Sequence, residues 1–247
     1  MIPLHDGNPT RRQPVVTLAV ILVCMVVYFL VQPSPFSSTT DDTRFDYAHA
    51  VVPLEVRTGH PVSACAVAPR TCSQLGAGDA IFPGKHVYLA LLESMFLHGS
   101  IAHLAGNVLF LWVFGNNVED RLGRVRFALF YLAAGVVSAV GYVAVHPSGV
   151  TTLLGASGAI AGTMGAYLVW FPRARVLTLV TIVPIRLPAW IVLLAWFGLQ
   201  FFTGPSSQVA WVAHVAGFVF GVIVGLALRS EVPPAGGLTP PWPAPRR

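Results

Sequence analysis

The chemistry of this chain is best approached through a serine and a histidine that lie in two separate apolar stretches. Ser157 follows the small residues Gly155 and Ala156 and opens one apolar run, and His214 lies inside another. A serine hydroxyl activated by a histidine base is the arrangement of covalent acyl-transfer catalysis. Neither run contains Asp or Glu. The pattern therefore favours a Ser157–His214 catalytic dyad over a full triad.

A third apolar stretch carries His103 and Asn107, which are four residues apart. That spacing places both side chains on one face of a helix. Hydrogen-bond donors beside an attacked carbonyl stabilise the developing oxyanion by about 2.7–4 kcal/mol each. We interpret this pair as candidate oxyanion contacts.

The composition indicates the environment in which this chemistry would occur. Hydrophobic residues make up 55% of the 247 residues and charged residues 10%, against about 25% charged residues in soluble domains. So few charges cannot cover a soluble surface, so we predict an all-α polytopic membrane protein embedded in the lipid bilayer. The basic residues behind the net charge of +5 flank the apolar runs and form no nucleic-acid footprint.

Six apolar runs predict six transmembrane helices joined into one membrane domain over residues 14–229. The first run is interpreted as a retained helix rather than a signal peptide. A polar segment precedes the domain at 1–13, a long loop occupies 32–86, and a Pro-rich tail at 230–247 is predicted to be disordered. The predicted spans are 14–31, 101–118, 127–145, 157–171, 188–202 and 209–228.

The Lys and Arg residues are distributed unequally between the two sides that six spans define. Four lie in the long first loop, and the two short turns on the same side have none. The other eleven lie in the terminal segments and in the loops after the second and fourth spans. The positive-inside rule then places both termini in the cytoplasm, in a multi-pass protein of the cell membrane.

The polar residues of the second, fourth and sixth spans are expected at a similar depth. These three spans run from outside to inside and carry His103, Asn107, Ser157 and His214 in their outer parts. The fourth span, as a helix of about 22 Å, is shorter than the roughly 30 Å hydrocarbon core. We therefore predict that Ser157 begins a helix below the outer surface, at an outward-facing, water-filled cavity. A helix N-terminus there favours developing negative charge.

Small residues explain how the fourth and sixth spans would approach each other. Each span has two glycines in small-xxx-small spacing, which permits close backbone packing. If these faces meet, Ser157 and His214 come within hydrogen-bond reach. The fifth span is rich in aromatic residues, which we expect to face lipid. The glycines are Gly158, Gly162, Gly217 and Gly221.

The cysteines do not form a metal-binding pattern, and we predict neither metal nor cofactor. Cys24 lies in the first span and is interpreted as a packing residue. Cys65 and Cys72 lie in the long first loop, where a disulfide requires an oxidising compartment. The sequence leaves open whether these two cysteines pair.

Taken together, these motifs resemble the rhomboid family of intramembrane serine proteases, over about residues 14–229. The order of the motifs and the six-span topology also resemble the basic form of that family. The matching pieces are His98-x4-His103-x3-Asn107, Gly115-x3-Glu119-x3-Gly123, Gly155-Ala156-Ser157-Gly158 and Ala213-His214-x2-Gly217-x3-Gly221.

The resemblance implies a serine endopeptidase with Ser157 as nucleophile and His214 as general base. It implies an oxyanion hole made by His103, Asn107 and the backbone N–H of Ser157. Substrates would be transmembrane segments of other proteins, cut near the outer membrane boundary after entry past the fifth span. The alternatives are a catalytically silent rhomboid-like protein that binds clients, or a transporter, which would gain nothing from Ser157 at a helix start.

Two departures from the family pattern are visible. Leu89-Ala90 stands where the family often has Trp-Arg in the first loop. Ala161 stands where many members have a tyrosine that packs on the histidine. The second departure removes one expected support of His214. The substrate, the cleaved bond, the role of the long loop and the oligomeric state are not determined by the sequence.

Overall fold

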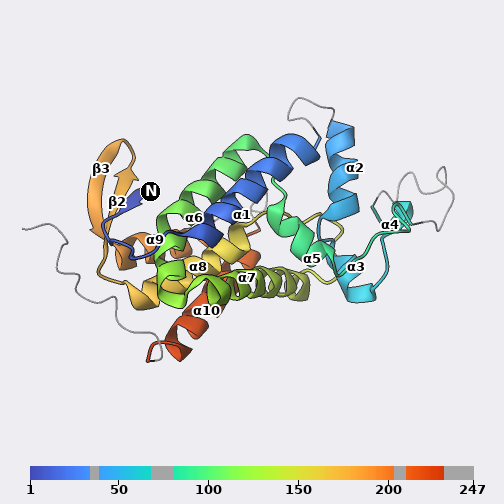
Figure 1. Ribbon diagram of the computed structural model, residues 1–247. Coiled ribbons are helices and arrows are strands. Elements are labelled where there is room, and N and C mark those ends of the chain that lie inside the picture. Colours follow the sequence, from blue (N-terminus) through green and yellow to red (C-terminus); the bar gives the residue numbers. More distant parts are fainter. Residues whose placement is uncertain (34–38, 68–79, 203–209, 231–247) are drawn as a thin grey trace, which may run out of the picture.

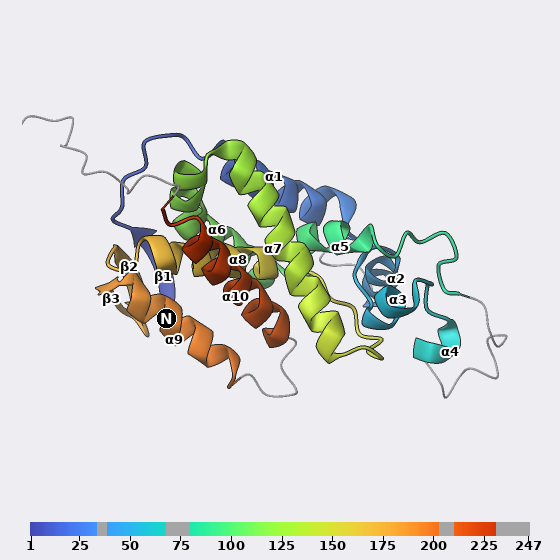
Figure 2. The ribbon, with the colours of Figure 1, turned by 90° about the horizontal axis from the view of Figure 1, so that it is seen from below.

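The structure, a computed structural model, describes residues 1–33, 39–67, 80–202 and 210–230. It is mostly helical, and the apolar runs form the bundle shown in Figure 1. Both views place a small sheet at one end of the bundle and the helices of the first loop at the other (Figures 1 and 2). The helices of the bundle are α1 (Val15–Val26), which continues as a π-helix over Val27–Val31, α6 (Ile101–Leu122), α7 (Arg124–Val145), α8 (Ser157–Trp170), α9 (Ala189–Gln200) and α10 (Trp211–Ala227).

Two of the described helices, α6 and α7, are long and apolar enough to cross a membrane. The helical segment 15–31, α9 and α10 are apolar but shorter. Each bundle helix lies within a few residues of its predicted span, and α8 begins at Ser157 as expected. The predicted tail falls almost wholly at 231–247, outside the described residues.

Helix α8 is the central element of the bundle. It packs against α6, α7, α9 and α10, and most of its residues are buried. A helix that is apolar and buried all round needs small side chains wherever a neighbouring helix comes close. The sequence of α8, with three glycines and three alanines among 14 residues, meets that requirement.

Glycines allow α8 and α10 to touch backbone to backbone. A Cβ atom added to Gly217 would collide with the carbonyl oxygen of Gly158. One added to Gly221 would collide with the carbonyl oxygen of Gly162. The two predicted small-xxx-small faces therefore meet, and a larger residue at either site would force the helices apart.

Helix α1 is attached to α6 through a buried carboxylate. Glu119, which is 2% exposed, accepts hydrogen bonds from the backbone N–H groups of Val16 at 2.9 Å and Thr17 at 2.8 Å. It also accepts one from the Thr17 hydroxyl at 2.8 Å. These bonds satisfy N–H groups of the first turn of α1, which have no partner within the helix. They also explain why α6 extends beyond the predicted boundary at Val118.

The long first loop is folded around a buried ion pair. Its helices are α2 (Thr39–His49), α3 (Pro53–Thr58) and α4 (Ala64–Val67), and α5 (Ala90–Glu93) with a 3₁₀ turn (Ser94–Phe96) leads back to the bundle. Lys85 Nζ lies 2.6 Å from Glu55 Oε2, and both side chains are 2% exposed. The same ammonium donates to the carbonyl oxygens of Tyr47 at 2.8 Å and Ala50 at 2.7 Å. A segment interpreted from sequence only as a loop thus has its own internal anchor.

One of the two cysteines of the loop lies among the described residues. Cys65, in α4, is disulfide-bonded, whereas Cys24 is free and buried in the bundle. Cys72 lies outside the described residues, so its pairing with Cys65 stays a hypothesis.

The expectation of an all-α fold was wrong at one end of the molecule. A three-stranded antiparallel sheet of order β1-β2-β3 is formed by β1 (Ile2–Asp6), β2 (Arg175–Val180) and β3 (Val183–Pro188). The hairpin β2–β3 connects α8 to α9, and β1 adds to its free edge from the N-terminal segment. Helical periodicity cannot reveal a strand whose partner lies so far along the chain.

The N-terminal strand is also held by a buried carboxyl group. Asp6, which is 3% exposed, accepts hydrogen bonds from Asn117 Nδ2 of α6 and from the Tyr167 hydroxyl of α8, both at 2.6 Å. Burial raises the pKa of the Asp6 carboxyl to about 6. The N-terminal segment is therefore a packed part of the fold that contacts the helix carrying Ser157.

We predict that Gly221→Ala lowers the stability of the protein by roughly 1–3 kcal/mol, the usual cost of overpacking a tight site. The added methyl group would collide with the backbone of α8, which cannot rotate away. Gly198→Ala is the matched control, since a Cβ at this helical glycine of α9 meets nothing within 4 Å. Thermal unfolding in detergent should show a loss for the first variant and no loss for the second. Equal melting temperatures for both variants would contradict the described contact.

The second prediction concerns pH. The raised pKa means that the folded state holds the Asp6 proton more tightly than the unfolded state, whose carboxyl has a pKa of 3.8. Stability should therefore fall as pH rises from about 4 to about 6 and then level off. Asp6→Asn should remove the share of Asp6 in this step and leave that of Asp46, whose pKa burial also raises to about 6. Asp120→Asn, which removes a carboxylate that accepts bonds from the N–H groups of Arg11 and Arg12, should retain the whole step. A step of undiminished size in Asp6→Asn would show that Asp6 does not contribute to it.

Candidate active site

Ser157 and His214 are brought together by the packing of α8 on α10. Ser157 is the first residue of α8, and His214 lies in the first turn of α10. The Ser157 Oγ is 2.7 Å from His214 Nε2, which is a hydrogen-bond distance. A hydroxyl and an imidazole in this contact can pass a proton from oxygen to nitrogen when the hydroxyl attacks an electrophile.

Gly155 requires the conformational freedom of glycine. Its φ of +123° is a backbone conformation that residues with a side chain rarely adopt. A Cβ at this position would also lie 2.9 Å from Nε2 of His103 and 3.7 Å from Oγ of Ser157. The glycine thus lets the chain turn tightly into α8 while the His103 ring lies against it.

The irregular segment before α8 is supported from the first loop. The backbone N–H of Gly155 donates to the carbonyl oxygen of Ser94 at 2.8 Å. Leu153 and Val51 exchange two backbone hydrogen bonds, of 2.7 and 3.1 Å. Non-helical backbone near the site therefore has protein partners, as burial requires.

His103 and Asn107 lie at the start of α6. Ser100 caps this helix, accepting a hydrogen bond from the His103 N–H at 3.1 Å. The Asn107 side-chain nitrogen donates to the His103 carbonyl oxygen at 3.0 Å. Both side chains line the same cavity as Ser157 and His214. The four predicted polar residues thus lie around one space.

That space is a cavity of about 1160 Å³ between the ends of α6, α7, α8 and α10. Asp46 of α2 and the segment 151–154 also contribute to its walls. A neighbouring pocket of about 390 Å³ shares Asp46 of α2 with it, and also Gly99, Ser100 and Ala102 at the start of α6. The cavity is large enough for several side chains of a peptide segment and for water.

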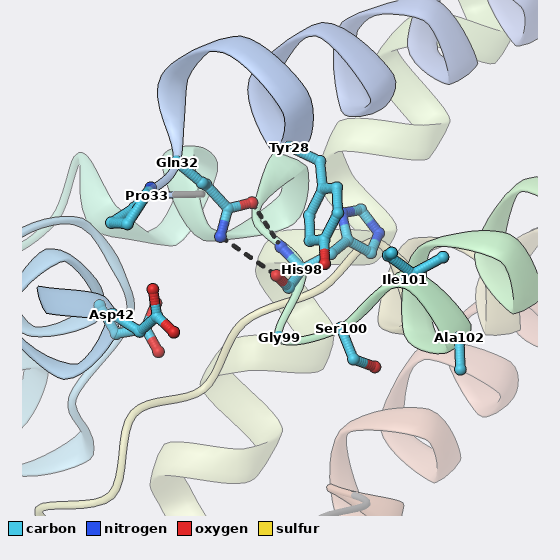
Figure 3. A pocket seen from close by; sticks show the side chains of 10 residues that line it. Tyr28, Gln32, Pro33, Asp42, His98, Gly99, Ser100, Ile101 and Ala102 are labelled. Atoms are coloured by element: carbon cyan, nitrogen blue, oxygen red, sulfur yellow. Dashed lines mark hydrogen bonds between the residues drawn. The ribbon is translucent and has the colours of Figure 1, made fainter. Parts of the chain in front are cut away.

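The neighbouring pocket shows how the approach to α6 is held (Figure 3). Gln32, just after the helical segment 15–31, donates from Nε2 to the His98 carbonyl oxygen at 3.1 Å and accepts from the His98 N–H at 2.9 Å. The ring centroids of His98 and His103 lie 5.3 Å apart, and the two rings meet edge to face. The Gln32 amide thus attaches the end of the first span to the segment that leads into His103.

Two residues of α9 that the sequence interpretation missed contact His214. Gln200 Oε1 lies 2.7 Å from His214 Nδ1, and the Trp196 ring lies 5.7 Å from the imidazole. The expectation that the aromatic residues of this span face lipid was wrong for Trp196, which also packs on Phe110 and Phe218. Phe202, by contrast, is 84% exposed. The one available signal was a single amide, Gln200, in an apolar run.

Gly158 also lies close to a serine of α7. Ser138 donates to the carbonyl oxygen of Ala213 at 2.8 Å, and a Cβ at Gly158 would collide with its hydroxyl. This buried serine therefore ties α7 to the residue that precedes His214. Within the described ranges, no group of three or more His, Cys, Asp or Glu side chains could hold a metal ion.

The fold and this geometry define an apolar helical bundle with a Ser–His pair at one end. The family model of the Rhomboid domain matches residues 85–231, which is more than half of the chain. The chain belongs to the rhomboid family. The match includes the four predicted site residues His103, Asn107, Ser157 and His214.

Individual relatives agree with this assignment. The chain is 40% identical over 98 residues to rhomboid protease GluP of Bacillus subtilis, covering 40% of this chain and 19% of GluP. It is 30% identical over 158 residues to the mitochondrial rhomboid protein 1 of Saccharomyces cerevisiae, covering 58% and 43% of the two chains. It is 40% identical over 89 residues to the human mitochondrial presenilin-associated rhomboid-like protein, covering 34% and 23%. In each case the match spans less than half of the relative's length.

Proposed function

We propose that this protein is an intramembrane serine endopeptidase with Ser157 as nucleophile and His214 as general base. The 2.7 Å contact between Ser157 Oγ and His214 Nε2 carries the proposal, because it joins a nucleophile to a base at a cavity that admits a peptide. The similarity to a relative named as a protease, GluP, supports peptide-bond hydrolysis.

In the proposed reaction the Ser157 oxygen attacks the scissile carbonyl carbon while its proton passes to His214 Nε2. The imidazolium then donates this proton to the leaving amine, and the C–N bond breaks to leave an acyl-enzyme. Water from the cavity, activated in turn by His214, hydrolyses the ester. The dyad needs no third titratable residue for this sequence of proton transfers.

The oxyanion would lie at the N-terminus of α8. The backbone N–H of Ser157 is one of the first N–H groups of that helix, where the helix dipole favours negative charge. Asn107 supplies a second donor, since a primary amide has two hydrogens and its bond to the His103 carbonyl uses one. His103, whose ring lies against Gly155 in the same cavity, supplies the third.

The proposed membrane arrangement has six spans within a domain at residues 14–229, with both termini in the cytoplasm of a cell-membrane protein. The basic residues at the sheet end of the bundle support that orientation. The disulfide-bonded Cys65 at the opposite end supports an oxidising environment around α2–α4. The site residues lie within the first two turns of α6, α8 and α10. Given that orientation, this supports a cavity near the outer boundary.

The proposed substrates are transmembrane segments of other membrane proteins, cut close to that outer boundary. A peptide bond inside a regular helix is shielded by its own turns, so the substrate segment must unwind to reach Ser157. The cavity offers water and polar groups to an unwound segment, and entry past α9 brings it there from the lipid.

The deciding experiment is cleavage of a model transmembrane substrate by the purified protein in liposomes. Ser157→Ala and His214→Asn should each lower kcat by at least about 10³-fold, because such dyad members act as a unit. Ser148→Ala, at an exposed serine in a turn, should cleave at the wild-type rate. A fluorophosphonate probe should label the wild type at Ser157 only.

Melting temperatures would establish that the variants are folded. Cleavage that survives Ser157→Ala would overturn the assignment of the nucleophile. A folded wild type that binds the substrate without cutting it would favour the client-binding alternative.

A further inference from the structure

The least expected contact of the site is the amide of Gln200 on the far side of the His214 ring. Gln200 is the last residue of α9 and is 6% exposed. Its Oε1 lies 2.7 Å from His214 Nδ1. Its Nε2 donates to the carbonyl oxygen of Trp196, one turn earlier, at 3.1 Å. The side chain thus bridges its own helix and the histidine of α10.

The second bond determines which way the amide faces. An amide nitrogen can only donate and a carbonyl oxygen can only accept. Turning the amide over would bring the Gln200 oxygen against the Trp196 carbonyl oxygen, so two acceptors would face each other without a hydrogen. The oxygen therefore faces His214, and Nδ1 must carry the hydrogen of that bond.

The position of this hydrogen decides what Nε2 can do. A neutral imidazole has one N–H and one lone pair. With the hydrogen on Nδ1, the lone pair is on Nε2, which lies 2.7 Å from the Ser157 hydroxyl. This is the tautomer that accepts the serine proton. The opposite tautomer would point an N–H at Ser157 and could not act as a base.

We propose that Gln200 is a positioning residue that holds His214 in its reactive tautomer and orientation. The proposal rests on the proposed function, in which His214 is the base. Gln200 stands where a Ser-His-Asp triad has its aspartate, but it has no charge. It orients the imidazole and contributes less to stabilising the imidazolium than a carboxylate would.

Because of these contacts, the tautomer and the orientation of the His214 ring depend on the position of α9. Trp196 lies beside one face of the His214 ring, and Gln200 binds its Nδ1. Both belong to the helix that follows directly from strand β3. Moving the end of α9 away from α10 would remove both supports together.

The test compares substitutions at Gln200 in the full-length protein. Gln200→Met keeps the length of the side chain and removes the acceptor. It should lower kcat by about 10²-fold, less than the roughly 10⁴-fold loss when a triad aspartate is replaced by its amide, and should change KM less than threefold. Gln200→Glu restores the acceptor for His214 Nδ1 but puts its second oxygen against the Trp196 carbonyl oxygen, so it should recover only part of the cleavage lost in Gln200→Met. Leu199→Ala, at an exposed neighbour on α9, is the matched control and should be neutral.

A spectroscopic measurement separates positioning from general damage. Long-range ¹H–¹⁵N correlation spectra of histidine-labelled protein distinguish the two tautomers, and His214→Asn identifies the signals of His214. The wild type should show the Nδ1–H form, and Gln200→Met should lose it while its melting temperature stays close to that of the wild type. Full cleavage by Gln200→Met, or an unchanged tautomer in it, would overturn the proposal.

The outcomes also distinguish this inference from the proposed function. A wild type that cleaves and a Gln200→Met that cleaves equally well would defeat the role of Gln200 and leave the protease intact. Alternatively, the wild type does not cleave, but its Nδ1–H form disappears in Gln200→Met. This result would contradict the proposed protease function and support the role of Gln200 in positioning His214.

Discussion

The approach of α8 to α10 is the constraint on which the rest of the structure depends. At Gly158 and Gly217, and one turn later at Gly162 and Gly221, the two backbones touch without side chains between them. Ser157 lies one residue before the first of these contacts, and His214 lies three residues before its partner. The 2.7 Å bond between the two side chains is therefore a consequence of helix packing. A hydrophobic driving force between helices is weak in lipid, so this close van der Waals contact is what holds the pair together.

A central helix that is short and buried must be secured at both ends. At the N-terminal end of α8, the irregular segment that turns at Gly155 is bonded to Ser94 and to Val51. Val51 follows directly on Ala50, whose carbonyl oxygen binds the buried ammonium of Lys85. Toward its other end, Tyr167 donates to the buried carboxyl of Asp6 in strand β1. Segments outside the bundle thus support both ends of the helix that presents Ser157, which gives the long first loop and the N-terminal segment a structural role.

The sequence was most informative where a local pattern has a local physical cause. Apolar runs of helical length predicted the bundle, and a start of helix at Ser157 followed from the shortness of its run. The glycine spacing predicted which faces of α8 and α10 meet, because only those faces lack side chains. The small sheet was missed because β1 and its partner β2 are separated by most of the chain. The helices of the first loop were missed because their anchor, the Lys85–Glu55 pair, joins residues with no shared periodicity.

By itself the sequence indicated the membrane class and the candidate pair Ser157 and His214, since each follows from hydropathy, length or spacing along one helix. Only the tertiary structure decided what surrounds the imidazole. Gln200 and Trp196 reach His214 because α9 lies beside α10 with a particular rotation about its own axis, and no pattern within α9 encodes that rotation. Helix rotation is set by packing against neighbours and by the sheet that precedes α9. The direction in which the His214 proton faces is therefore a property of the assembled bundle.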